Sequence, residues 1–312
     1  MHHPRHHVSH PHPTRLGLLQ ISLAGVLWGT GGLAVQVVRE ATPMSVLVVS
    51  AYRMLIAAAV LGLAVVALRR LGAVATLLRA QPRRAVLVGA GTAAYQALYF
   101  GAVVQVGVSV ATVVSLGLAP VLLTVGESVR ARRTPSPSRL LVLAAAVCGL
   151  LLVSLGAGGD TGPNPLLGVL AAVGSGSAYA LTTVLGRPLA QGHAPLALTT
   201  VTTSVGAVVL LPLALLSGLA GSPVVTADPV AVSTLAYLGL VTMALAYGLL
   251  YAGLRTTSGS AAVIATLLEP ATAAVVAAAF LDERIGLAGV AGTALILVAV
   301  AGLGKEPSVP PA

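Results

Sequence analysis

Glu269 and Pro270 interrupt a stretch, 261–281, that is otherwise apolar apart from two threonines. A charged carboxylate in hydrocarbon is costly unless it is paired, hydrated or protonated, so we expect Glu269 to face the interior of a helix bundle. Pro270 removes a backbone donor and frees a carbonyl one turn earlier, which allows a kink. Glu269 could therefore bind a substrate ammonium group or a proton, or it could form a structural ion pair with a donor on another helix.

Arg53 is the expected partner of Glu269, because it lies about two turns inside another apolar run, 46–68. The cost of a charge in lipid predicts that Arg53 also faces inward. Its guanidinium could bind a substrate carboxylate, or it could hold helices together through Glu269 or backbone carbonyls.

Aromatic residues recur on four of the apolar runs. Tyr247 and Tyr251 are four residues apart, as are Tyr95 and Tyr99, so each pair shares one face of a helix. Such pairs offer ring faces and hydroxyls to an amphipathic organic substrate, or they pack helices together at the interface. The candidate lining residues are Trp28, Tyr95, Gln96, Tyr99, Tyr179, Tyr247 and Tyr251.

Two further patterns concern helix contacts. Glu127 comes three residues before Arg130 at the end of an apolar run, which predicts an ion pair at the membrane interface. Gly25 and Gly29 are four residues apart, and residues 174–177 alternate glycine and serine. Such small residues let helices approach closely or slide.

The composition predicts an all-α integral membrane protein. Of the 312 residues, 57% are hydrophobic and 8% are charged. Runs of about 20 apolar residues without alternation favour helices over a barrel. Ten spans are expected: 16–38, 46–68, 85–106, 109–126, 140–156, 166–185, 196–216, 230–254, 260–281 and 286–303.

The same sequence argues against several function classes. Lys305 is the only lysine and lies outside any phosphate-binding loop pattern, which excludes a Walker ATPase. His193 is the only histidine outside the N-terminal tail, and no span contains an aspartate, so enzyme chemistry is not expected. Cys148, the only cysteine, is expected to be a packing residue. We expect no cofactor, no metal site and no nucleic acid partner. The histidine-rich tail 1–15 should be disordered and bind metal weakly at most.

Charge predicts the topology. With ten spans and the N-terminus inside, 14 of the 17 basic residues fall on the inner side, as the positive-inside rule requires. Eight longer helices are the rival count. The tail lacks a secretory signal, so the first span is expected to be retained in a cytoplasmic membrane, with both termini cytoplasmic.

The two halves of the chain resemble each other. Aligning Pro120 with Pro270 places 99–120 over 249–270, with several coincident small and apolar residues. The expected repeats are 16–157 and 166–303, followed by a cytoplasmic tail, 304–312. Five spans in each repeat would invert the second copy relative to the first, a plan used by secondary transporters. The two prolines are candidate hinges.

Several segments carry a family resemblance. "AYGLLYAGLRTTSGSAAVIATLLEPATAAVVAAAFLDERI", "SAYRMLIAAAVLGLAV" and "AGVLWGTGG" are similar to EamA-type members of the drug/metabolite transporter superfamily. The resemblance implies a central cavity lined by the first, third, sixth and eighth spans, and it favours a structural or gating role for Arg53. One departure is that Arg133 stands thirteen residues after Pro120, whereas Glu283 stands thirteen after Pro270.

We therefore expect a secondary transporter that exports a small amphipathic metabolite, amino acid-like or drug-like, by alternating access. Its partners would be this substrate and the lipid bilayer, with Glu269 as the carrier if a proton is coupled. It would be a monomer or a homodimer. The alternative is a non-transporting assembly or lipid-handling subunit.

Overall fold

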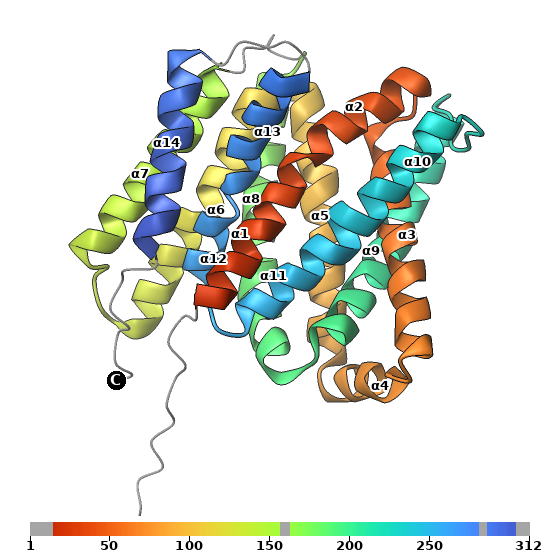
Figure 1. Ribbon diagram of the computed structural model, residues 1–312, viewed down its shortest axis with the longest axis horizontal. Helices are drawn as coiled ribbons and strands as arrows, with labels where there is room; N and C mark the ends of the chain where they lie inside the picture. Colours follow the sequence, from red (N-terminus) through yellow and green to blue (C-terminus); the bar gives the residue numbers. More distant parts are fainter. Residues whose placement is uncertain (1–14, 157–162, 281–285, 304–312) are drawn as a thin grey trace, which may run out of the picture.

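The computed structural model describes residues 15–156, 163–280 and 286–303, and every regular element in these ranges is a helix (Figure 1). The elements are α1 Arg15–Gly29, α2 Gly31–Ala41, α3 Val46–Ala67, α4 Leu71–Ala80, α5 Pro82–Val106, α6 Val108–Ala131, α7 Pro137–Gly156, α8 Pro165–Gly192, α9 Pro195–Leu219, α10 Pro229–Tyr237, the π-helix η1 Leu238–Leu245, α11 Ala246–Leu254, α12 Gly259–Ala265, α13 Leu268–Phe280 and α14 Leu287–Leu303.

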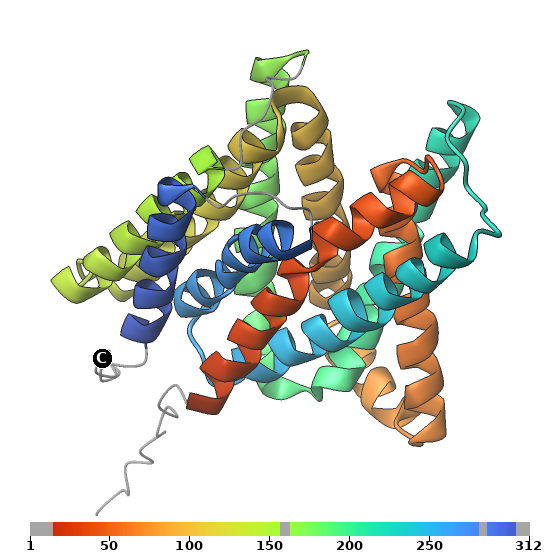
Figure 2. The ribbon, with the colours of Figure 1, turned by 45° about the horizontal axis from the view of Figure 1, so that its top comes forward.

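The predicted spans coincide with these helices. Nine segments of the described chain are long and apolar enough to cross a membrane. The tenth predicted span forms α14, whose 17 residues extend about 25 Å. α14 packs beside α7 at one end of the molecule (Figures 1 and 2). The expectation of an all-α membrane protein is confirmed.

Three of the predicted spans are broken near their middle. The first span breaks at Thr30, between α1 and α2. The eighth is divided by the π-helix η1, and the ninth breaks at residues 266–267, between α12 and α13. Pro270 is the third residue of α13, where a missing N–H removes no intrahelical bond. By contrast, α6 runs through Pro120 without a break.

Helices at equivalent places in the two halves make equivalent contacts. α3 packs against α9, and α7 packs against α14, so both pairs join the halves. α1 packs against α11 as α8 packs against α5. α1 also packs against α12 and α13, as α8 packs against α6. Exchanging the halves therefore preserves which helices touch, as expected for a fold made of two inverted repeats.

Glycines permit the closest of these approaches. A Cβ on Gly25 would lie 3.1 Å from the Thr266 carbonyl oxygen, and a Cβ on Gly176 would lie 2.5 Å from that of Ser115. Between α7 and α14, a Cβ on Gly149 would lie 2.8 Å from the carbonyl oxygen of Gly292. The small residues singled out in the sequence thus lie where helix backbones meet.

The two ends of the described chain lie at the same face. α1 begins and α14 ends at the lower face in Figure 1, where α4 also lies. Residues 71–80, between the second and third predicted spans, form the short helix α4, which packs on α9. Cys148 is exposed on α7, so its expected packing role is wrong. The tails and the segment with Asp282 to Arg284 lie outside the described residues.

Candidate functional site

Thr242 connects three elements at the centre of the bundle. The indole Nε1 of Trp28, on α1, donates to the Thr242 carbonyl oxygen at 2.8 Å. Arg53 Nη2, on α3, donates to the Thr242 hydroxyl at 3.1 Å. That hydroxyl donates in turn to the Leu238 carbonyl at 2.7 Å. Because Thr242 belongs to η1, the π-helix positions both the tryptophan and the arginine.

Arg53 is held by packing but not saturated by hydrogen bonds. A Cβ on Gly239 of η1 would lie 2.5 Å from Ile56 and 3.4 Å from the Arg53 carbonyl, so η1 and α3 are in close contact. Arg53 Nε is buried, and it has no hydrogen-bond partner in the described chain. A guanidinium has five N–H donors, so Arg53 retains donors for an anionic group.

Glu269 lies in the first turn of α13, directly after the break in the ninth span. Its backbone is fixed by α1, because a Cβ on Gly29 would come within 2.5 Å of the Glu269 carbonyl oxygen. Within the described ranges, no hydrogen bond or salt bridge reaches its carboxylate. Glu269 and Arg53 interact electrostatically, but they do not form the contact ion pair that was one of the sequence-based alternatives.

The predicted aromatic residues gather on two sides of the interior. Tyr95 stacks on Tyr179 with ring centroids 5.1 Å apart and on Tyr99 at 6.3 Å. On the other side, Tyr247 packs edge-on against Trp28 at 5.0 Å and lies 6.1 Å from Tyr251. The first group comes from α5 and α8, and the second from α1 and α11. These helices correspond to the first, third, sixth and eighth spans, from which the candidate residues were taken.

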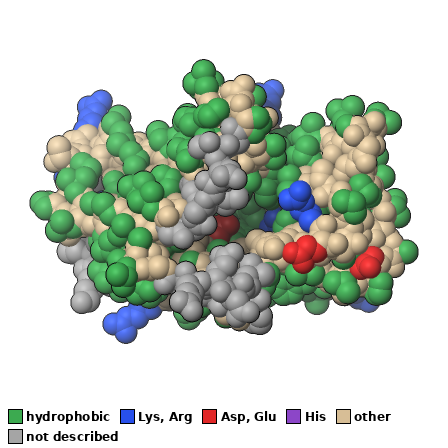
Figure 3. Space-filling model, turned by 90° about the horizontal axis from the view of Figure 1, so that it is seen from above, with side chains coloured by type: hydrophobic (Ala, Val, Ile, Leu, Met, Phe, Trp, Pro, Cys, Tyr) green, Lys and Arg blue, Asp and Glu red, His purple; other side chains and the backbone are tan. Residues whose placement is uncertain are grey.

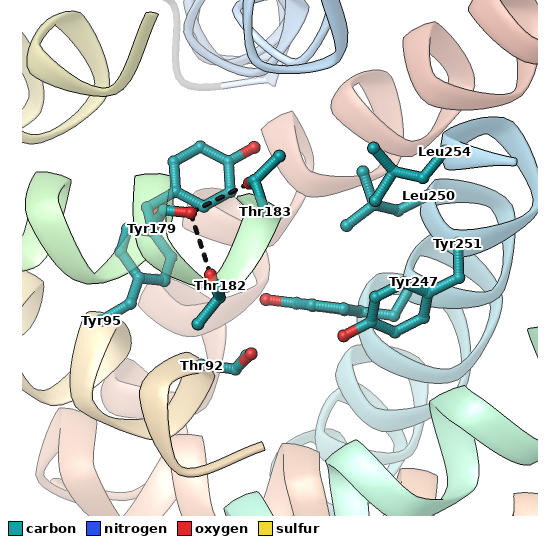
Figure 4. A pocket seen from close by; sticks show the side chains of 9 residues that line it. All are labelled: Thr92, Tyr95, Tyr179, Thr182, Thr183, Tyr247, Leu250, Tyr251 and Leu254. Carbon is teal, nitrogen blue, oxygen red and sulfur yellow. Dashed lines mark hydrogen bonds between the residues drawn. The ribbon is translucent and has the colours of Figure 1, made fainter. Parts of the chain in front are cut away.

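Four of these tyrosines line one pocket (Figure 4). The pocket is narrow, with free space of about 10 Å³, roughly enough for one water molecule. In Figure 4, Tyr247 and Tyr251 point into the pocket from α11, opposite Tyr95 and Tyr179. Its lining residues are Thr92, Tyr95, Tyr179, Thr182, Thr183, Tyr247, Leu250, Tyr251 and Leu254.

The sequence-based interpretation missed the threonines of this pocket. The Thr182 and Thr183 hydroxyls both donate to the Tyr179 carbonyl at 2.9 Å (Figure 4). Thr182, Thr183 and Thr92 lie three or four residues from a predicted tyrosine, a spacing that places them on the same helix face. That spacing is the signal that could have identified them.

Other predicted residues lie outside the pocket. Tyr99 shares a 2.8 Å hydrogen bond with Thr112 on α6. Trp28, Arg53 and Glu269 are not among the lining residues. Gln96 is 5% exposed, and neither polar atom of its amide has a partner in the described part of the chain. Such a buried amide retains full capacity to bind water or a ligand.

The predicted pair of Glu127 and Arg130 is wrong. The Glu127 carboxylate instead accepts a hydrogen bond from Arg139 on α7. It also accepts from the backbone N–H of Ser260 at 3.1 Å and from the Ser260 hydroxyl at 2.7 Å. Arg139 donates to Ser260 as well. We call these three residues the Glu127 cluster; they join α6 and α7 of the first half to the start of α12 in the second.

The Glu127 cluster lies toward the face at which the described chain begins and ends. Nearby, Arg187 Nε donates to the Thr257 carbonyl at 2.8 Å, which ties α8 to the connection between α11 and α12. The opposite face differs. Figure 3 shows a hollow near the middle of that face, with an acidic side chain in its depth and a basic side chain at its edge. A charged hydrogen-bond network therefore joins the two halves toward one face, and the opposite face is recessed.

These features define a class: a polytopic helical membrane protein of two similar halves, with charged and aromatic residues between them. The family profile described as "EamA-like transporter family" matches residues 15–155 and 166–304. The chain belongs to this family. It is 31% identical over 292 residues to "Uncharacterized transporter YwfM" of Bacillus subtilis (strain 168), covering 93% of this chain and 94% of that protein.

A solved structure has the same fold. A protein of known crystal structure matches with a TM-score of 0.74 over 92% of this chain and 95% of its own. The two sequences are 19% identical, so this match shows the fold alone. The chain is thus a membrane transporter by family, and a small-molecule substrate follows from that membership.

Proposed function

We propose that the protein is a secondary transporter of the cytoplasmic membrane that exports a small amphipathic metabolite, amino acid-like or drug-like, by alternating access. Family membership supports transport. The observation that carries the proposal is that Arg53 and Glu269 lie in the bundle without a contact ion pair among the described residues, where Arg53 Nε also has no hydrogen-bond partner. Each keeps capacity to bind a further group.

The two charges would bind opposite groups of the cargo. A carboxylate accepts hydrogen bonds from an ammonium group or takes up a proton, and a guanidinium donates to an anionic group in a planar, two-pronged geometry. The tyrosine rings on either side would contact the apolar part. The pocket that they line is too narrow for such a molecule, so binding requires the two halves to separate there.

The Glu127 cluster would form the barrier at one end of the pathway. Its three residues come from α6, α7 and α12, so opening this end must separate the halves at this point. A charge-assisted network that breaks and re-forms suits alternating access, because it stabilises one closed state without contributing to the other.

The end closed by the Glu127 cluster would be cytoplasmic. The inner loops collect 14 of the 17 basic residues, which favours placing the α4 face inside. The energy would come from the cargo gradient or a coupled ion. Glu269 would carry the proton if protons are coupled.

The test compares metabolites outside and inside cells that express wild type, Glu269→Gln or Glu40→Gln at equal membrane levels. Glu40 is an exposed carboxylate near the end of α2 and serves as the matched control. One metabolite should accumulate outside with wild type and Glu40→Gln. With Glu269→Gln its export should fall on the order of tenfold or more, the usual effect of losing a charge-assisted hydrogen bond.

Two results would contradict the proposal. Export by Glu269→Gln at the wild-type rate would remove Glu269 from the transport cycle. Identical metabolite profiles for wild-type and empty cells would exclude export under those conditions and favour an importer or a non-transporting subunit.

A further inference from the structure

The connection between α3 and α5, together with the residues that border it, carries a cluster of arginines. Residues 68–84, which we call the α4 segment, contain five arginines, and no acidic residue occurs between Glu40 and Glu127. Among the described residues, no salt bridge involves any of the five. Arg84 is half-buried and donates to Gln81 at 2.7 Å. The exposed arginines are Arg69, Arg70, Arg79 and Arg83.

α4 itself has three distinct faces. Leu77 is fully buried, on the face that packs against α9. Leu71 and Leu78, seven residues apart and so on one face, are 59% and 39% exposed. Arg79 lies on the third face, in line with Thr76 and Gly72. In Figure 1, α4 lies across the end of the bundle. An exposed apolar stripe beside a basic residue, on a helix with further arginines at both ends, suits a helix at a membrane interface.

These features do not follow from the fold. The equivalent connection in the second half joins α9 to α10 at the opposite face, and it contains no helix between residues 220 and 228. No lysine or arginine occurs from residue 188 to 254. The other basic connection, between α6 and α7, is also without a helix, and its Arg139 is already bound by Glu127. In the part of the chain that the structure describes, only the α4 segment combines a short helix with several arginines that form no salt bridge there.

We propose that the α4 segment binds the headgroup of an anionic phospholipid. Leu71 and Leu78 would contact the upper acyl chains, while Arg79 and the arginines that flank α4 would donate to phosphate oxygens. Guanidinium groups suit this role because they bind phosphate in a two-pronged geometry. Clusters of four to eight basic residues beside a membrane span are the usual sign of anionic lipid recognition. This proposal does not depend on the identity of the cargo.

The test is a native mass spectrometry titration of the purified full chain with phosphatidylglycerol and, separately, phosphatidylcholine. Wild type should bind phosphatidylglycerol more tightly. The triple variant Arg70→Gln, Arg79→Gln, Arg83→Gln should lose this preference, with affinity lower by on the order of tenfold to a hundredfold. The control is a second triple variant that loses the same amount of charge at the other basic connection: Arg130→Gln, Arg132→Gln, Arg133→Gln. This variant should keep the preference for phosphatidylglycerol.

Several outcomes would overturn the proposal. Equal losses in both triple variants would show that only net charge matters, and no loss in either would remove the α4 segment from lipid binding. Displacement of the lipid by inorganic phosphate at equal concentration would indicate a site for soluble anions. If the α4 triple variant fails to fold, Arg79→Gln alone should still weaken phosphatidylglycerol binding, and an unchanged affinity in that variant would contradict the proposal.

Discussion

Gly29 shows how a single residue controls the geometry of the candidate site. It ends α1 beside Trp28 and lies against the start of α13. A Cβ there would stand 2.5 Å from both the Glu269 carbonyl oxygen and Thr272 Cβ. Gly32, one turn further along, has nothing within 4 Å of the equivalent position. The two glycines therefore provide a matched pair for testing the contact.

We predict that Gly29→Ala destabilises the protein by about 1–3 kcal/mol, the typical cost of overpacking. Gly32→Ala should leave stability unchanged or raise it by up to about 1 kcal/mol, because alanine is the better helix former. Thermal unfolding of both variants in the same detergent measures the difference. Equal stability of the two variants would mean that α1 and α13 are not in this close contact.

At the same scale, the carboxylate of Glu269 has no counterpart in the first half. With Pro120 aligned on Pro270, the equivalent residue is Ala119, which is fully buried. The fold is built of two similar halves, yet the charge is contributed by one of them. The two halves therefore cannot contribute equally to any step that involves this carboxylate.

At the scale of elements, the start of α12 is held by the first half of the chain. The Ser258 hydroxyl is the N-cap and accepts from the Ala261 N–H. The N–H of Ser260, one residue earlier in the same first turn, donates to the Glu127 carboxylate. Glu127 thus caps a helix that belongs to the other half. Thr183 lies just behind this contact, 3.5 Å from the Cβ position of Gly259.

Glu127→Gln should open this end of the interior more often. In a Cys148→Ala background, a cysteine at Thr183 should react with an impermeant thiol reagent about threefold to tenfold faster when Glu127 is replaced, given the usual strength of a cap and a part-exposed ion pair. The reagent is applied to the α4 face in inside-out vesicles. Arg130→Gln is the control and should leave the labelling rate unchanged. If both changes raised the rate equally, the Glu127 cluster would have no specific role in keeping this end closed.

The helices that a local sequence pattern defines could be predicted, whereas contacts between residues far apart in the sequence could not. Apolar length predicted the helices of all ten spans, because the cost of unpaired backbone in lipid depends on the segment alone. α4 was missed because its ten residues are too few to span and lie among arginines. The partner of Glu127 was missed because Arg139 and Ser260 are 12 and 133 residues away. Thr242 gave no signal, since a threonine on an apolar helix commonly bonds its own backbone.

At the scale of the whole molecule, the end of α2 and the α4 segment lie at opposite faces (Figure 1). The charge distribution predicts that the α4 face is cytoplasmic. In a Cys148→Ala background, an impermeant maleimide should therefore label Glu40→Cys in intact cells and Arg79→Cys only after permeabilisation. Both residues are exposed, so accessibility does not differ for local reasons. The reverse labelling pattern would mean that the α4 face is extracellular. The end that carries the Glu127 cluster would then face outward, which contradicts the proposed orientation.

Trp28 is the only tryptophan in the chain. Its indole is hydrogen-bonded to the Thr242 carbonyl and packed edge-on against Tyr247, between α1, η1 and α11. The intrinsic emission of the protein above the tyrosine band therefore originates from one place, where the two halves meet beside Arg53. The wavelength and intensity of this tryptophan fluorescence therefore depend on that contact. They can be followed through a cycle of binding and release without attaching a dye.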